Sequence, residues 1–320
     1  MTSCLDRRSN VTTILGGNLT GEDEKEGYNA QLRAEDGLLT PLVDSIGYLL
    51  KFTRANFIPI FEKHVVPVLG KYLSSTADVR ASVASMCLFD DCVEYCGQDA
   101  AARYSPLLVK GVMTVFQDPS KYDRDLVQAA VYGVCQMSRQ APSTVMSPHI
   151  QTIVHQLMML SQGSKEDAGD ALYLHELAVS ALASLTLFGP FSNLKFVNRA
   201  SVMDIFLSDL PLQEDEDEAT ICHAGLCTLI ENGSINLVSE ASRITKITGA
   251  ILSDVQEGLG VASPETCERL LSIVNQLHHQ NPQAVMQAYA GLDSDAQNIL
   301  SSAIQNYSQS GSRIVTPEKM

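Results

Sequence analysis

Carboxylates are the side chains in this sequence whose clustering most strongly indicates a possible binding or catalytic role. The densest run is five successive acids, Glu214-Asp215-Glu216-Asp217-Glu218. One well-placed carboxylate stabilises a helix N-terminus by about 0.3–1 kcal/mol, and mutual repulsion offsets part of the gain from five. The run therefore predicts either a solvated helix start or an acidic patch that receives Lys and Arg side chains of a partner.

A second acidic pair, Asp90 and Asp91, lies inside a strongly apolar segment. Neighbouring helical residues point about 100° apart, so at most one of the two lies squarely on the buried side. We expect them to be structural carboxylates between neighbouring repeats, one of them accepting hydrogen bonds from backbone donors. A catalytic dyad is not indicated, because no His, Lys or Ser pattern accompanies the pair.

The remaining candidates for chemistry have the wrong spacing. The seven histidines are scattered, and neither Cys222-His223 nor His278-His279 forms a metal-ligand pattern. His175 is followed by Glu176 but lacks the second histidine of a zinc-protease motif. The sequence contains no GxxxxGK[ST], GxGxxG or GxSxG. It predicts no catalytic residue, no cofactor and no metal, and hence a protein that is not an enzyme.

The elements that carry these residues recur about every 46 to 48 residues. Four amphipathic helical segments rich in Ala, Val, Leu and Cys are predicted at Val79–Cys96, Leu126–Gln140, Leu172–Phe188 and Ala219–Glu231. A more apolar helical segment precedes each of them, at Phe57–Leu73, Pro106–Phe116, Ile150–Leu160 and Val202–Leu210. Helix pairs with a period of roughly 40–47 residues are typical of HEAT arrays. The predicted fold is all-α, an α-solenoid (superhelix) of HEAT repeats.

The predicted organisation has three parts. Residues 1–36 form a flexible, acidic, glycine-containing segment, because glycines and the run at 22–26 interrupt any helical pattern. Residues 37–307 form a solenoid of about five helix pairs plus a terminal helix, and residues 308–320 are a tail. Further helices are expected at Leu38–Phe52, Ile235–Val255, Glu265–His278 and Asp293–Tyr307, with a break near Pro67.

Composition narrows the partners. The 22 basic and 37 acidic residues give a formal net charge of −15, which disfavours direct binding to nucleic acid or anionic membranes and attracts basic proteins. Eight cysteines without a CxxC pair suit a reducing compartment. No apolar run reaches the roughly 18 residues of a membrane span, and the start lacks the apolar core of a signal peptide. We expect an intracellular protein without membrane insertion.

Four stretches carry a family resemblance. They are MCLFDDCVEYC (Met86–Cys96), VQAAVYGVCQM (Val127–Met137), LPLQEDEDEA (Leu210–Ala219) and LDSDAQNILSSAI (Leu292–Ile304). In order and spacing they resemble late HEAT repeats and the closing helix of the importin-β superfamily (karyopherin-β nuclear transport receptors), especially the importin-5 type. The resemblance covers roughly residues 38 to 304 and corresponds to the C-terminal region of such receptors.

This resemblance implies nuclear import. Basic cargo proteins with nuclear-localisation signals would bind an acidic inner face, with the five acids at 214–218 as cargo contacts. Phe-Gly repeats of nuclear-pore proteins would bind outside, between Phe57–Leu73 and Pro106–Phe116 or between the latter and Ile150–Leu160. Ran GTPase would bind N-terminal repeats that are missing here. The protein would shuttle between cytoplasm and nucleus and occur at pores of the nuclear envelope.

Two other classes stay open at this point. The first is a structural HEAT scaffold subunit of a phosphatase or of another multiprotein complex. The second is an enzyme built on a helical solenoid, which no sequence motif supports. Cargo identity, oligomeric state and whether Met1 is a natural start do not follow from the residues.

Overall fold

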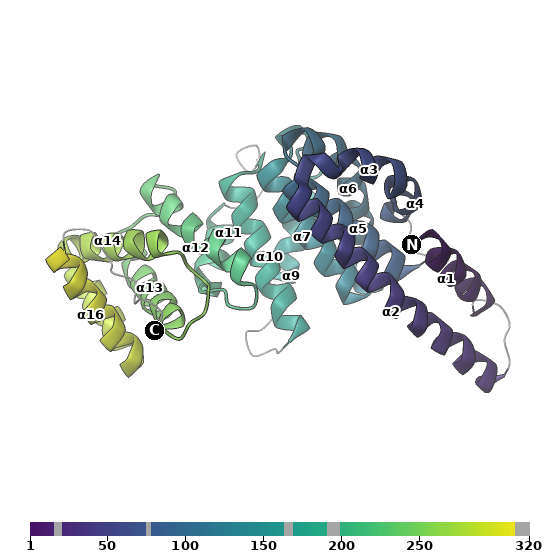
Figure 1. Ribbon diagram of the computed structural model, residues 1–320. Helices are drawn as coiled ribbons and strands as arrows, with labels where there is room; N and C mark the ends of the chain where they lie inside the picture. Colours follow the sequence, from purple (N-terminus) through teal and green to yellow (C-terminus); the bar gives the residue numbers. More distant parts are fainter. Residues whose placement is uncertain (16–20, 75–77, 163–168, 191–198, 311–320) are drawn as a thin grey trace. The chain divides into compact units, whose positions relative to one another are not determined.

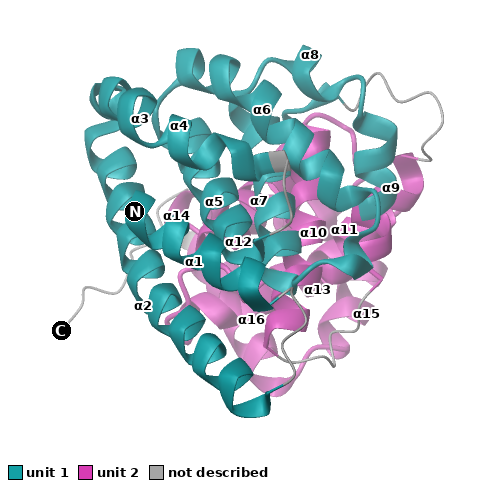
Figure 2. Ribbon diagram, turned by 90° about the vertical axis from the view of Figure 1, so that its right-hand side faces the viewer, with its two compact units in different colours: residues 1–156, 188–195 teal, residues 157–187, 196–320 magenta. Residues whose placement is uncertain are grey.

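The computed structural model describes residues 1–15, 21–74, 78–162, 169–190 and 199–310. Regular structure in these ranges is helical and includes no β-strand (Figure 1). This confirms the all-α class and the helix pairs predicted for a solenoid of HEAT repeats. Contacts divide the chain into two compact units, Met1–Gln156 with Phe188–Lys195 and Leu157–Leu187 with Phe196–Met320 (Figure 2).

The first unit consists of two helical layers. Its helices are α1 Thr2–Leu15, α2 Glu22–Thr53, α3 Ile58–His64, α4 Val66–Leu69, α5 Val79–Tyr95, α6 Gln98–Phe116, α7 Arg124–Gln140, α8 Ser143–Met146 and the first part of α9 Ile150–Leu160. Helices α2, α5 and α7 pack side by side in chain order. Figure 2 shows α3, α4, α6 and α8 in the layer above them. One helix of each of the first two predicted pairs thus contributes to each layer.

Aromatic rings hold the two layers of the first unit together. Phe61, Phe89 and Tyr104, from α3, α5 and α6, meet edge to face with ring centroids 5.5 to 5.7 Å apart. All three are buried, and such geometry adds about 0.5–1.5 kcal/mol per pair beyond burial. Asp78 fixes the start of α5 by accepting a hydrogen bond from the Ala81 backbone nitrogen at 3.2 Å.

The second unit has the same alternation of helices. It contains α10 Asp170–Leu187, α11 Arg199–Asp209, α12 Glu216–Glu231, α13 Ala241–Gln256, α14 Pro264–Gln280, α15 Pro282–Ala290 and α16 Ser294–Ser310. Helix α10 packs on α11 and α12, and α12 packs on α14. Helices α13, α14 and α16 enclose a core of Leu252, Cys267, Leu271 and Leu300. The terminal helix therefore covers the apolar side of the last pair, as the sequence predicts.

Most predicted helices agree with the structure within a few residues. Helices α5, α7, α10 and α12 match the four predicted second helices, and α9 begins and ends where predicted. The predicted break near Pro67 is also present, since α3 ends at His64 and α4 begins at Val66. Helix α6 begins at Gln98, earlier than the predicted Pro106, and Pro106 lies inside it.

The largest difference concerns residues 1–36. They contain α1 and the beginning of α2, where the sequence had suggested no helix. Acidic residues in the first turn of α2 favour its N-terminus, and α1 packs against it. At the other end, α16 extends to Ser310, and residues 311–320 of the predicted tail lie outside the described residues. The extent of the solenoid, 37–307, stays a prediction.

Candidate partner-binding groove

The acidic run forms the start of α12 in the second unit. Asp215 is the N-cap, and its Oδ1 accepts a hydrogen bond from the Glu218 backbone nitrogen at 3.0 Å. Its Oδ2 accepts from the Tyr173 hydroxyl at 3.2 Å. Glu218 is buried and accepts a hydrogen bond from the Ser180 hydroxyl. Two of the five acids therefore join α12 to α10.

The other three acids differ in whether their carboxylates are already hydrogen-bonded. A carboxylate oxygen of Glu216 accepts from the Gly260 backbone nitrogen at 2.9 Å. Glu214 and Asp217 are exposed, so their carboxylates are the ones a partner could reach. Contact between the acidic run and cargo stays a prediction. Glu214 and Asp217 are the residues of the run best placed to make it.

Asp90 lies on the side of α5 that faces α7. Only 1% of its surface is exposed, and neither carboxylate oxygen has a hydrogen-bond partner among the described residues. A β-carbon added to Gly133 of α7 would lie 2.7 Å from Asp90 Oδ1, so the carboxyl fills the space above that glycine. Burial, and secondarily the charges of Asp91 and Glu94, raise the pKa of Asp90 well above its ordinary value. The expected hydrogen bonds to backbone donors are absent at Asp90.

Asp91 faces the opposite neighbour, α2. A β-carbon added to Gly47 would lie 2.6 Å from Asp91 Oδ2, so α2 approaches α5 closely here. Burial raises the pKa of Asp91 to about 7, Glu94 and Asp44 add to the increase, and Lys51 opposes it. The two adjacent aspartates therefore serve opposite sides of α5, as the 100° angle between them requires.

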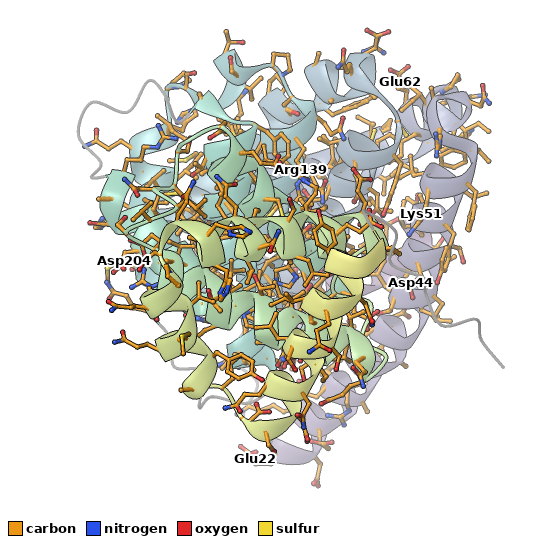
Figure 3. All side chains as sticks on the ribbon, turned by 90° about the vertical axis from the view of Figure 1, so that its left-hand side faces the viewer. Glu22, Asp44, Lys51, Glu62, Arg139 and Asp204 are labelled. Atoms are coloured by element: carbon orange, nitrogen blue, oxygen red, sulfur yellow. The ribbon has the colours of Figure 1, made fainter. Side chains whose placement is uncertain are left out.

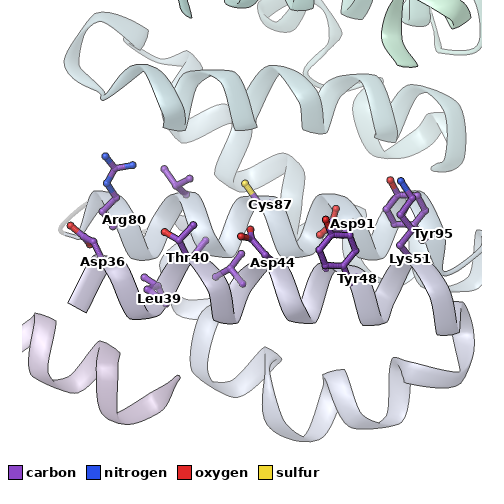
Figure 4. A pocket seen from close by; sticks show the side chains of 14 residues that line it. Asp36, Leu39, Thr40, Asp44, Tyr48, Lys51, Arg80, Cys87, Asp91 and Tyr95 are labelled. Carbon is purple, nitrogen blue, oxygen red and sulfur yellow. The ribbon is translucent and has the colours of Figure 1, made fainter. Parts of the chain in front are cut away.

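A groove of about 390 Å³ runs between α2 and α5 (Figure 4). Its acidic lining residues are Asp36, Asp44 and Asp91. Tyr48 and Tyr95 lie with Lys51 at one end, and Asp36 and Arg80 at the other. The exposed Asp44 therefore lies in the middle of the groove, and the Asp91 carboxyl lies beside Tyr48 toward its aromatic end.

The groove already contains a cation. Nζ of Lys51 lies 5.4 Å from the centre of the Tyr95 ring, a distance at which a cation is attracted by the aromatic face. Asp44 and Lys51 lie along the same helix, α2 (Figure 3). Tyr48 is 63% exposed, so its ring is open to a ligand. The groove therefore combines groups suited to Lys or Arg side chains.

A second groove, of about 550 Å³, lies in the second unit beside α11 and the start of α13. Met203, Leu207 and Ile235 form its apolar part, while Arg243 bonds to Asp204 at 2.8 Å at its side. This groove is distinct from the two places expected for Phe-Gly repeats, which involve α3, α4, α6 and α9. Binding of Phe-Gly repeats at those two places stays a prediction.

His223 in the second unit is a packing residue. His223 is fully buried, its Nδ1 lies 2.8 Å from the Val261 carbonyl oxygen, and its Nε2 accepts from the Leu212 backbone nitrogen at 3.2 Å. Burial lowers the pKa of His223 to about 4. The side chain is therefore neutral, with its proton on Nδ1. In the part of the chain that the structure describes, no group of three or more His, Cys, Asp or Glu side chains is arranged to hold a metal ion.

Sequence reasoning found Asp91 and the acidic run but missed the aromatic and cationic members of the groove. Their signal was present in the spacing. Positions 36, 40, 44, 48 and 51 share one side of α2, and positions 80, 84, 87, 91 and 95 share one side of α5. Only the pairing of these two helices reveals that both sides face one groove.

Comparison with known proteins supports a distant relationship. No protein-family model matches the sequence. A curated protein of Dictyostelium discoideum described as "Probable importin-5 homolog" is 22% identical over 228 residues. The match covers 70% of this chain and 20% of the relative, so the chain spans about a fifth of that protein's length. The similarity supports an importin-like HEAT-repeat protein at most. None of the described helices is both long and apolar enough to cross a bilayer.

Proposed function

We propose that this chain is a protein-binding HEAT-repeat segment of importin type that takes basic segments of partner proteins in the groove between α2 and α5. The observation that carries this proposal is the combination of Asp44 and Asp91 with the open ring of Tyr48 in one groove. Its aspartates attract an ammonium or guanidinium group, and the ring offers it a favourable face. The net charge of −15 steers basic partners toward the molecule.

The nature of the partner follows from the resemblance to importins. A nuclear-localisation signal is a short basic segment, and the exposed Glu214 and Asp217 would offer a separate contact for basic partners in the second unit. One exposed ion pair contributes only about 0.2–1 kcal/mol, so useful affinity requires several contacts along the segment. The same proposal includes shuttling between cytoplasm and nucleus. A response to Ran, as in the expectation above, would require N-terminal repeats that this sequence does not include.

Binding of a Lys- and Arg-rich peptide, followed by fluorescence anisotropy at low salt, tests the groove. The double variant D44N/D91N should weaken binding at least about tenfold. The control double variant D99N/E257Q also removes two acids, both exposed and outside the groove, and should bind as the unchanged protein does. Equal affinities of the two double variants would reject the groove as the binding site.

Nuclear-pore contact is a second part of the proposal. The resemblance places Phe-Gly repeats between α3–α4 and α6 or between α6 and α9, and the groove beside α11, lined in part by Met203, Leu207 and Ile235, is a further candidate. Titration of a Phe-Gly peptide into isotopically labelled protein should shift resonances of these residues. Shifts spread evenly over the chain, or none, would reject this site.

The scaffold alternative makes a different prediction. A scaffold subunit would co-purify from extract with a phosphatase or kinase catalytic subunit and would ignore basic peptides. Capture of such a subunit by both the unchanged protein and D44N/D91N would favour the scaffold. Capture that requires Asp44 and Asp91 would favour recognition of basic partners.

A further inference from the structure

Two adjacent arginines hold α1 on the first unit. Nη2 of Arg7 donates to Glu35 Oε2 at 2.8 Å, and its Nε donates to the other oxygen of the same carboxylate. Arg8 makes a similar forked contact with Asp78, from Nη2 to Oδ1 at 2.9 Å and from Nε to Oδ2 at 3.2 Å. Its remaining nitrogen, Nη1, donates to Asp36. These bidentate geometries are the ones a guanidinium makes with a carboxylate that recognises it specifically.

We name Glu35, Asp36 and Asp78 the carboxylate clasp. Glu35 and Asp78 are buried, with 6% and 8% of their surfaces exposed. Removing one partner of a buried ion pair leaves an uncompensated charge, which is strongly unfavourable. The clasp therefore favours a basic occupant while it is covered, and in this structure α1 supplies it.

The clasp lies at an end of the candidate groove. Asp36 belongs both to the clasp and to the lining of the groove, at the end opposite Lys51 and Tyr95 (Figure 4). A basic segment that follows the groove toward Asp36 therefore reaches one of the three carboxylates that Arg7 and Arg8 contact.

Helix α1 packs on the first unit through one side only. Its buried residues are Cys4, Leu5, Arg8 and Val11, a single narrow side of a 14-residue helix. Isolated helices of this length are marginal in water, and elements with few buried apolar contacts open at low free-energy cost. The contacts of Arg8 with Asp78 and Asp36 therefore add to the apolar attachment of α1 and fix its position on α2 and α5.

We propose that the carboxylate clasp is a binding site for two adjacent arginines on a helical segment, and that α1 fills it as a built-in ligand in competition with a partner's basic helix. The first part stands on the contacts of Arg7 and Arg8. The competition rests on the proposed function, because it requires that the partner segment be basic.

The test uses a labelled synthetic peptide of residues 1–15 that carries C4S and is added to the full chain. Binding to the variant R7A/R8A should be at least about tenfold tighter than to the unchanged protein, because the cis helix no longer competes. The control variant R33A/K63A removes two exposed cations and should bind as weakly as the unchanged protein. A peptide that itself carries R7A and R8A should bind neither. Equal binding to the unchanged chain and to R7A/R8A would overturn the proposal.

Thiol labelling of Cys4 gives a second readout. Cys4 is 3% exposed, and its Sγ lies 3.4 Å from the Glu35 carbonyl oxygen. Its labelling rate, followed by mass spectrometry, should rise at least about tenfold in R7A/R8A, while Cys267 in the second unit keeps its rate. An unchanged Cys4 rate would show that α1 stays seated without its arginines, against the proposal. Adding D78N to R7A/R8A, which retains an acceptor for the cap of α5, should abolish the gained peptide affinity.

The two proposals fail in different ways. A Lys- and Arg-rich peptide that binds the groove and leaves Cys4 labelling unchanged would overturn the competition, while the proposed function stands. A Lys- and Arg-rich peptide that does not bind, together with a residues 1–15 peptide that binds R7A/R8A, would reject the proposed function and support the clasp.

Discussion

Gly133 and Asp90 are in direct apposition: a β-carbon at position 133 would lie 2.7 Å from Asp90 Oδ1. The buried carboxyl therefore occupies the space that any other residue at position 133 would claim. On the other side of α5, Gly47 and Asp91 stand in the same relationship. Close packing of α2, α5 and α7 thus depends on two glycines that each face an aspartate.

We predict that G133A destabilises the protein by roughly 1–3 kcal/mol, because the added methyl overlaps the buried Asp90 carboxyl and forces it to shift. Urea unfolding followed by circular dichroism measures the change. The matched control is G27A in α2, where a β-carbon meets nothing within 4 Å, and Ala in a helix is favoured over Gly by about 0.5–1 kcal/mol. A G133A variant as stable as G27A would contradict the apposition.

The raised pKa of Asp91 predicts a pH-dependent loss of stability. Its folded-state pKa of about 7 exceeds the ordinary value of 3.8, so the folded chain binds the proton more tightly. The resulting penalty is absent below pH 4, grows as pH rises and is complete above pH 7, reaching on the order of 4 kcal/mol. D91N should therefore be more stable than the unchanged protein at pH 8 and equally stable at pH 4. An advantage of D91N that is the same at both pH values would contradict this assignment.

The lowered pKa of His223 predicts the opposite trend. The pKa is about 4 in the folded chain and 6.5 ordinarily, so the unfolded chain takes up the proton first. Stability is lost as pH falls from 6.5 toward 4. H223Q loses the hydrogen bonds to Leu212 and Val261 and should be less stable than the unchanged protein at pH 7.5. The difference in free energy of unfolding between the two proteins should shrink by roughly 2 kcal/mol between pH 7.5 and pH 5. The exposed His279, changed to Gln, serves as the control and should show no such narrowing.

Charge reversal tests the acidic run. E214K/D217K changes the two exposed acids and spares Asp215, which caps α12, and Glu218, which is buried. Thermal stability should change little, while affinity for a Lys- and Arg-rich peptide should fall about tenfold at low salt and less at 0.5 M salt. An unchanged dissociation constant at low salt would reject cargo contact at this run.

The helix pairs were predictable because their signals are local. Asp78 precedes α5 and caps it, and apolar residues then recur at helical spacing, so the predicted start at Val79 agrees with the structure. Asn281 caps α15 and Pro282 is its first residue, a pattern typical of a helix start. The prediction did not include this helix. Pro106 was interpreted as a helix start, although the structure tolerates it inside α6.

The helix α1 was not predictable because its support is distant in sequence. Arg8 bonds to Asp78, 70 residues away, and no periodicity within residues 1–36 reveals that contact. The candidate groove was only half predictable for the same reason. Asp91 could be identified within its own helix, but the approach of Lys51 to Tyr95 depends on how α2 packs against α5.

The ring cluster of Phe61, Phe89 and Tyr104 has a consequence for how the first unit melts. Helices α3 and α5 belong to one pair, whereas α6 begins the next. Arrays whose repeats touch only weakly lose their end repeats first, one at a time. Because one aromatic cluster spans two successive pairs here, neither can fray without opening the other, and we expect their amide protons to exchange with solvent as a single cooperative block.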